Sequence, residues 1–294
     1  MKSIDTVIQA FQLVIKNPKI IAIGLIGSLV YLLLLISLMI PLVILMYPSL
    51  SSAISTLLSA ISSNDFSELD DPSTLAPLTT FLIFAALLSV ILGIFVWPIF
   101  SGMTLNAGIQ AIKGKVSLKK AFNEAKKKYF SLLGVELIGI FSVLLLVGLC
   151  FIPLLLLFIS KVSEVVVLLI SLLFVFLLVF GLFVFIILFF ESWALVFTEN
   201  RKAIEAIKRS IYIGKKKFLS IIGVISFLSL ISLGIGVIIR IIQLFPSLFF
   251  ELLGLTLFRI IFEIFLNFIV GLFTGAVGGI LPVVFYYTYK EELK

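Results

Sequence analysis

The sequence predicts an all-α integral membrane protein with six transmembrane helices. Hydrophobic residue types make up 62% of its 294 residues and charged types 13%, whereas a soluble domain is roughly 45–50% apolar and about 25% charged. A helix needs about 20 apolar residues to cross a hydrocarbon core that is roughly 30 Å thick. Stretches of this kind occur at about 20–46, 78–100, 130–158, 163–190, 218–245 and 260–288. The run 165–190 does not alternate apolar and polar residues, so a β-barrel is excluded.

The chain lacks the residue types on which most enzymes and metal sites depend. It has no histidine and one cysteine. Histidine is a frequent general base and metal ligand, and a single cysteine forms neither an internal disulfide nor a cysteine cluster. The Gly-x-x-x-x-Gly-Lys-Ser/Thr motif, which binds nucleotide phosphates, does not occur. We therefore expect no metal, no cofactor and no enzymatic activity.

Basic residues gather on one side of the predicted spans. The N-terminal segment, the second-to-third and fourth-to-fifth connections and the C-terminal tail hold 19 of the 22 lysines and arginines. The first connection on the other side carries the acidic residues Asp65, Glu68, Asp70 and Asp71. Because cytoplasmic loops are rich in lysine and arginine, we expect a multi-pass protein of the cell membrane with both termini cytoplasmic. The first apolar run is too long for a signal peptide, so we expect it to be retained.

A nine-residue pattern recurs at the start of three odd-numbered spans. Lys126–Gly134 matches Lys215–Gly223 at five of nine positions, and Lys16–Gly24 occupies the same place before the first span. Each copy follows a short stretch whose apolar residues have helical spacing, as in a lysine-bearing helix that lies in the headgroup plane. The sequence thus predicts three pseudo-repeats of one interfacial helix and two spans, at about 1–112, 113–199 and 200–294. The alternative is that basic helices precede odd spans without true repetition.

The two longer connections on the outer side also contain apolar residues. Residues 50–61 have helical spacing and predict an interfacial helix, followed by an acidic, solvated loop over 64–77. Residues 244–258 are apolar but too short to cross the bilayer, and they include Pro246, Glu251 and Gly254. We expect them to form a re-entrant or interfacial helix.

Polar residues inside the predicted spans are candidates for function, because charges at membrane depth are costly. Glu136 and Glu191 lie roughly 8–12 Å inside the cytoplasmic edge, from a rise of ~1.5 Å per residue. Together with Asn106 and Asn267 they are candidates to line a polar cavity open to the cytoplasm. There the two glutamates would face each other, bind a cation or share a proton. The alternatives are snorkelling or pairing with nearby lysines for the two glutamates, and interhelical hydrogen bonds for the two asparagines.

A second group of charges is predicted near the outer ends of the last two spans. It consists of Arg240, Glu251, Arg259 and Glu263. Arg259 and Glu263 are four residues apart on one helix, so a local ion pair is expected, and Glu251 is a candidate partner for Arg240. The group either forms an outer vestibule or fixes the ends of the two helices.

Lysine triplets and a glycine stripe indicate contacts with lipids and with other helices. The expected partners are anionic lipid headgroups rather than nucleic acid, because the basic residues lie in short loops between spans. The predicted headgroup-binding residues are Lys126, Lys127, Lys128, Lys215, Lys216 and Lys217. Gly271, Gly275 and Gly279 form a close-packing face that either seals the bundle or makes a homo-oligomer contact.

Parts of the chain resemble a known membrane domain. Residues Glu199–Ser210, followed by Lys215–Gly223, resemble the cytoplasmic helix of the membrane domain associated with some glycerophosphodiester phosphodiesterases, and also related six-span proteins. The closing segment Leu281–Lys290 is similar to the last span of that group. The catalytic domain of the phosphodiesterases is absent here, so the resemblance implies the six-span fold and no hydrolase activity.

Taken together, these patterns favour a non-enzymatic membrane protein. It would be a passive transporter, a channel-like protein or a lipid-interacting protein with a polar cavity on the cytoplasmic side. The alternative is a structural or scaffold protein, homo-oligomeric through the glycine face, without transport activity.

Overall fold

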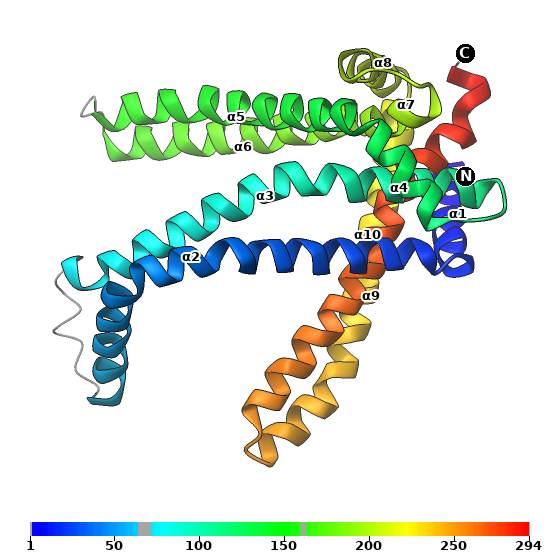
Figure 1. Cartoon of the computed structure of the whole chain (residues 1–294). Helices are drawn as coiled ribbons and strands as arrows, with labels where there is room; N and C mark the ends of the chain where they lie inside the picture. Colours follow the sequence, from blue (N-terminus) through cyan, green and yellow to red (C-terminus); the bar gives the residue numbers. More distant parts are fainter. Residues whose placement is uncertain (1, 64–71, 160–162, 294) are drawn as a thin grey trace. The chain divides into compact units, whose positions relative to one another are not determined.

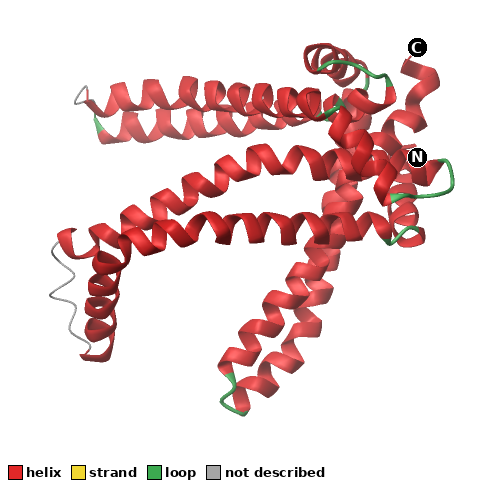
Figure 2. Cartoon of the chain, viewed as in Figure 1, coloured by secondary structure: helices red, strands yellow, loops and turns green. Residues whose placement is uncertain are grey.

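The computed structural model describes residues 2–63, 72–159 and 163–293, and every regular element in these ranges is a helix (Figures 1 and 2). Six of the described helical segments are long and apolar enough to cross a membrane. They are Lys19–Ser63, Ser73–Ile112, Tyr129–Pro153, Val165–Thr198, Phe218–Glu251 and Thr256–Leu293. Within the described residues the prediction of an all-helical chain is therefore confirmed, as is that of six helices with the length and apolar composition of membrane spans.

The helices follow one another with short connections. In chain order they are α1 (Lys2–Lys16), α2 (Lys19–Ser63), α3 (Pro72–Ile112), α4 (Leu118–Lys127), α5 (Tyr129–Ile159), α6 (Glu164–Phe189), α7 (Ser192–Thr198), α8 (Ala203–Lys216), α9 (Phe218–Leu252) and α10 (Thr256–Leu293). The chain divides into two compact units. The first combines Met1–Leu25 with Pro98–Lys294, and the second is Ile26–Trp97.

The second unit consists of α2 from Ile26 to Ser63 and α3 from Pro72 to Trp97. The Tyr31 hydroxyl donates to the Ser89 carbonyl oxygen at 3.0 Å, which ties the two helices together. Residues 50–61 are helical, as predicted, but they form the last turns of α2, beyond the sharp bend of that helix in Figure 1, and not a separate helix. Pro41 and Pro48 lie inside α2, and proline bends a helix because it lacks an N–H donor.

The acidic loop predicted over 64–77 lies partly outside the described residues. Residues 64–71, with all four of its acidic side chains, are not described. Residues 72–77, which we predicted as loop, are instead the first turns of α3. Pro72 begins that helix, a position where its missing N–H costs nothing and its fixed φ favours helix.

The first unit is built on two antiparallel helical hairpins. The long helices of each hairpin, α5 with α6 and α9 with α10, run side by side (Figure 1). The short helices α1, α7 and α8 pack against them, and α1 contacts both α9 and α10. On α1, Val7, Ala10 and Val14 are completely buried. The core of this unit therefore lies where the short helices meet the long ones.

The outer turn of the second hairpin differs from the prediction. Residues 244–258 do not form a separate re-entrant or interfacial helix, because α9 continues through Pro246 to Leu252. The chain then turns at Gly254, whose φ of 68° suits glycine. The Leu255 N–H donates to the Phe250 carbonyl oxygen at 2.8 Å, which closes the helix end. The residues after Pro246 continue the helix because one missing hydrogen bond does not end a long apolar helix.

The long helices expose many large apolar side chains, whose contact with water would be unfavourable. On α6, Leu172, Phe176 and Val179 are 69%, 64% and 61% exposed. Exposed apolar surface on this scale indicates contact with lipid. The helical backbone satisfies its own hydrogen bonds, as a membrane requires.

Candidate functional site: a basic groove and a buried carboxylate

Each lysine triplet sits where a short helix passes into a long one. Lys127 ends α4 and Tyr129 begins α5, whereas Lys216 ends α8 and Phe218 begins α9. The first two lysines of each triplet are exposed, and the third, at the junction itself, is half-buried. The six predicted headgroup-binding lysines therefore have two different environments.

Lys128, the third lysine of the first triplet, is bonded inside the protein. Its ammonium donates to the Val196 carbonyl oxygen at 2.7 Å and to the Asn200 side chain. It also lies 5.7 Å from the ring centroid of Phe197, as in a cation–π contact. Burial lowers the pKa of Lys128, and nearby Glu124 partly opposes that shift. The lysine thus fastens α5 to the segment that leads into α8.

Lys217, the third lysine of the second triplet, is bonded to the end of α10. It pairs with Glu292 and lies 5.3 Å from the ring centroid of Tyr289. Glu292 also pairs with Lys2 at the start of α1, and this hydrogen bond raises the pKa of Lys2. Lys217 therefore joins the ends of the chain to α9.

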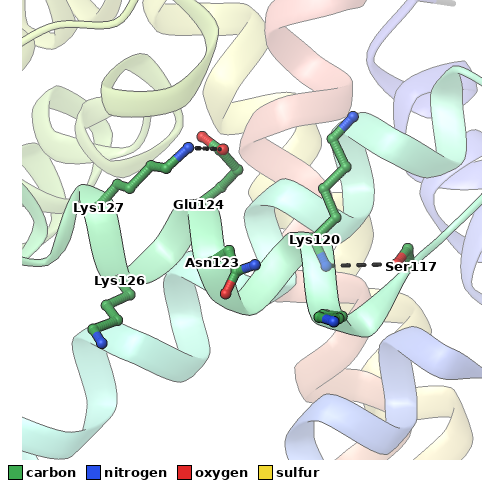
Figure 3. Close-up of a pocket in the computed structure, with 7 residues that line it drawn as sticks. Ser117, Lys120, Asn123, Glu124, Lys126 and Lys127 are labelled. Carbon is green, nitrogen blue, oxygen red and sulfur yellow. Dashed lines mark hydrogen bonds and ion pairs between the residues drawn. The ribbon is translucent and has the colours of Figure 1, made fainter.

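A groove of about 630 Å³ runs along α4 and is lined mainly by lysines (Figure 3). Its lining residues are Ser117, Lys119, Lys120, Asn123, Glu124, Lys126 and Lys127. Ser117 caps the helix, with its hydroxyl accepting a hydrogen bond from the Lys120 N–H. Lys127 pairs with Glu124 at 2.9 Å, and in Figure 3 Lys126 extends away from this pair.

The lysines of the groove were only partly recognised from the sequence. Lys126 and Lys127 were predicted to bind headgroups, but Lys119 and Lys120 were not. The signal was available, because positions seven residues apart lie on the same face of a helix. That spacing places Lys119 with Lys126 and Lys120 with Lys127.

Glu191 lies at a break in the fourth span. Its side chain is completely buried, as is that of the neighbouring Ser192. Within the described residues, both carboxylate oxygens of Glu191 and the hydroxyl of Ser192 lack a hydrogen-bond partner. The Ser210 hydroxyl accepts from the Glu191 backbone N–H at 3.2 Å and donates to the Leu188 carbonyl oxygen at 2.7 Å. The backbone of the break is thus bonded, whereas the carboxylate is not.

The other predicted cavity residues have separate environments. Glu136 on α5 is half-buried, with one carboxylate oxygen that is buried and lacks a hydrogen-bond partner in the described part of the chain. Asn106 accepts from the Gln110 side chain at 2.6 Å, and Gln110 in turn accepts from the Ser117 N–H at 2.8 Å. Asn106 therefore helps to hold the turn between α3 and α4. Asn267 is exposed on α10.

Charged and polar side chains bond to one another across the turn between α9 and α10. Arg259 pairs with Glu251 at 3.0 Å and approaches Glu263 at 3.8 Å, while Ser247 donates to Glu263 at 2.9 Å. Glu251 thus bonds to Arg259 and not to the suggested Arg240, whose side chain is exposed. These contacts fit the alternative in which the charges fix the ends of the two helices.

The three glycines of α10 differ in what lies next to them. A methyl group on Gly279 would lie 2.8 Å from Cγ2 of Thr104, so that glycine permits close packing against α3. Gly271 and Gly275 are exposed, and a methyl group on either would meet nothing within 4 Å. Within the first unit, only the last glycine of the stripe serves helix packing.

Sequence reasoning missed a charge network around Glu199. This carboxylate follows α7 and pairs with Arg201 and Arg209, and it accepts from the Tyr286 hydroxyl at 3.4 Å. Arg209 also donates to the Leu293 carbonyl oxygen at 2.7 Å. The network joins α7, α8 and α10, and no local pattern in the sequence brings these four residues together.

No family model, no curated protein and no solved structure matches this chain.

Replacing Gly214 by alanine is expected to destabilise the first unit by about 1–3 kcal/mol, the range for overpacking. A methyl group there would lie 3.0 Å from the Leu188 Cα and 3.1 Å from the Ile187 carbonyl oxygen, and these backbone atoms have little room to move. Thermal unfolding in detergent micelles measures the effect. The control is Gly236→Ala, because a methyl group at Gly236 would meet nothing within 4 Å. Equal melting temperatures for the two variants would contradict the close approach of α8 to the end of α6.

Proposed function

We propose that this protein binds anionic lipid headgroups through the basic groove on α4. The observation that carries the proposal is the charge of that groove: four lysines line it, and its one carboxylate, Glu124, is already paired with Lys127. Lysine ammonium groups near a membrane surface attract anionic lipids. The proposed role is non-enzymatic, and the proposed site is the cytoplasmic face of a cell membrane, with both chain termini on that side.

Apolar side chains beside the lysines support a position at the membrane surface. Phe122 on α4 is 44% exposed, and Phe130 at the start of α5 is 83% exposed. On α4 itself, Ala121 and Ala125 face the protein core, so the short helix has a buried face as well as exposed lysines and an exposed phenylalanine. A helix of this kind lies in the headgroup plane with its apolar side chains in the lipid. We propose the same position for α1 and α8, which expose Ile8 and Ile204.

The three proposed pseudo-repeats, at about 1–112, 113–199 and 200–294, are supported by the helix boundaries. Lys19, Tyr129 and Phe218 occupy equivalent positions in the recurring nine-residue pattern, and they begin α2, α5 and α9. Each of these long helices follows a short one after an interruption of one or two residues. A repeated unit of short helix and two spans explains why the breaks coincide.

Contacts at the three junctions also follow one pattern. Lys19 donates to the Val116 carbonyl oxygen at 3.2 Å, just before α4, and Lys128 bonds to the segment before α8. At the third junction the Ser3 hydroxyl of α1 donates to the Ser220 carbonyl oxygen at 3.2 Å. Each junction thus contacts the chain near the start of the next short helix, and the third returns to the first. Such an arrangement is what three related units around a common centre would produce.

The experiment measures lipid selectivity of the purified protein. Changing both Lys119 and Lys120 to Gln is expected to weaken phosphatidylglycerol binding by about 2 kcal/mol, or roughly 30-fold, at about 1 kcal/mol per charge near the surface. Native mass spectrometry from detergent, with phosphatidylcholine as the neutral comparison, gives the ratio. Binding of phosphatidylcholine is expected to stay unchanged.

A charge-matched control separates the groove from the overall charge of the protein. Lys202→Gln/Lys208→Gln removes two exposed lysines of the same side that do not line the groove. If both double variants lose the same selectivity, the groove has no special role. The scaffold alternative, which the exposed Gly271 and Gly275 of α10 favour, predicts that wild-type protein shows no preference for the anionic lipid.

A further inference from the structure

The fourth span is discontinuous. Its apolar segment runs from Val165 to Thr198, but α6 ends at Phe189 and α7 begins at Ser192. Figure 1 labels the two helices separately. Broken helices within membranes present helix ends and polar atoms to the interior, and such breaks are places where transported or structural ions bind.

The break holds a carboxylate that the described residues leave without a partner. Glu191 and Ser192 are both 0% exposed, and neither the carboxylate oxygens nor the serine hydroxyl has a hydrogen-bond partner in that part of the chain. An uncompensated charge in a low-dielectric interior is strongly unfavourable. The carboxyl group is therefore neutralised, by a cation beside it or by a proton on one of its oxygens.

The basic side chains of the neighbouring segments are already bonded to groups other than Glu191. Arg201 and Arg209 pair with Glu199, and Arg209 also donates to the Leu293 carbonyl oxygen. Lys128 donates to the Val196 carbonyl oxygen and to Asn200. Among the described residues no ion pair joins any of these groups to Glu191. The neutralising species therefore comes from solution, and a small cation is one such species.

The end of α6 supplies further oxygen atoms to the break. The C-terminal carbonyl groups of α6 carry partial negative charge, and Ser210 and Gly214 hold α8 tightly against that end of the helix. Carboxylate, hydroxyl and carbonyl oxygens are ligands for hard cations. The described ranges hold no group of three or more histidine, cysteine or acidic side chains placed to bind a metal ion, so the break lacks the several carboxylates that a divalent ion usually takes.

We propose that the break between α6 and α7 binds a monovalent cation, Na⁺, through the Glu191 carboxylate and the Ser192 hydroxyl. This inference is independent of the headgroup groove, which lies on α4. It gives the fourth span a role in ion binding that the lipid proposal does not supply.

The experiment uses Trp193, which directly follows Ser192, as a fluorescent reporter. The second tryptophan, Trp97, is changed to Phe, and the protein in nanodiscs is titrated with NaCl replacing choline chloride at constant ionic strength and pH. A saturable change in Trp193 emission and a rise in melting temperature are expected. Both responses are expected to be lost in Glu191→Gln and kept in Glu205→Gln, which alters an exposed carboxylate of α8.

Two further measurements make the test decisive. Ser192→Ala is expected to weaken Na⁺ binding by about tenfold, the loss of one ligand of roughly 1.4 kcal/mol. In choline chloride, Glu191→Gln is expected to melt above wild type, since it removes the uncompensated charge; this also shows that the variant folds. The proposal is overturned if wild type does not respond to Na⁺, or if Glu191→Gln responds equally. A response to pH with none to Na⁺ also overturns it, since a proton would then neutralise the carboxylate.

Discussion

Replacing Lys128 by methionine is expected to lower the free energy of unfolding by about 1–3 kcal/mol. Methionine keeps much of the side-chain volume but cannot donate, so the carbonyl oxygen of the completely buried Val196 loses its ammonium donor, and the exposed Asn200 side chain loses its bond as well. A buried acceptor left unsatisfied costs about 1–3 kcal/mol, whereas an exposed one bonds to water instead. The cation–π contact with Phe197 is lost as well.

Lys127→Met is the matched control for Lys128→Met. Lys127 is the preceding residue in the same triplet, but its side chain is 70% exposed and its ion pair with Glu124 is local to α4. Exposed pairs of this kind contribute about 0–1 kcal/mol. Unfolding in mixed micelles with increasing SDS gives both free energies. Equal, small effects in the two variants would show that the third lysine is no more structural than the second.

The lysine triplets show how much a local pattern reveals. Three consecutive lysines predict a cytoplasmic segment near a lipid surface, and the sequence alone gives no reason to treat Lys128 or Lys217 differently from its neighbours. The distinction arises because the helix breaks at the third lysine of each triplet. That break points the side chain toward partners 68 and 75 residues away, Val196 and Glu292. Partners so distant in sequence cannot be recognised from local spacing.

The spans themselves were predictable, because hydrophobic length is a local property. Their number was confirmed, and the starts of α5 and α9 fall within one residue of the predicted 130 and 218. The turn at Gly254 was misread because Pro246 and Glu251 interrupt the apolar run, although neither ends α9.

The environment of Glu191 could not be predicted from the sequence. Its place near the end of the fourth apolar run was read from the sequence, but the interruption at Phe190–Glu191 has no proline or glycine to mark it, and its burial depends on α8.

Replacing Glu199 by glutamine is expected to destabilise the protein by about 1–3 kcal/mol. The Glu199 side chain is only 15% exposed and accepts from Arg201, Arg209 and Tyr286. Removing the carboxylate leaves two guanidinium groups without their counter-charge, and because these are 37% and 25% exposed, solvent offsets part of the cost of a buried pair. Glutamine preserves the shape of the side chain, so the expected loss reports the charge and not a change in packing.

The control for Glu199→Gln is Glu205→Gln, which makes the same chemical change on the exposed face of α8. An exposed substitution of this kind is expected to change stability by less than about 0.5 kcal/mol. SDS unfolding separates the two, and a double change of Glu199→Gln with Arg209→Met tests the cause. If the loss comes from an unpaired guanidinium, removing Arg209 should recover part of it, although the bond from Arg209 to the Leu293 carbonyl oxygen is then lost as well. Purely additive losses would mean that Glu199 and Arg209 stabilise the junction of α7, α8 and α10 independently.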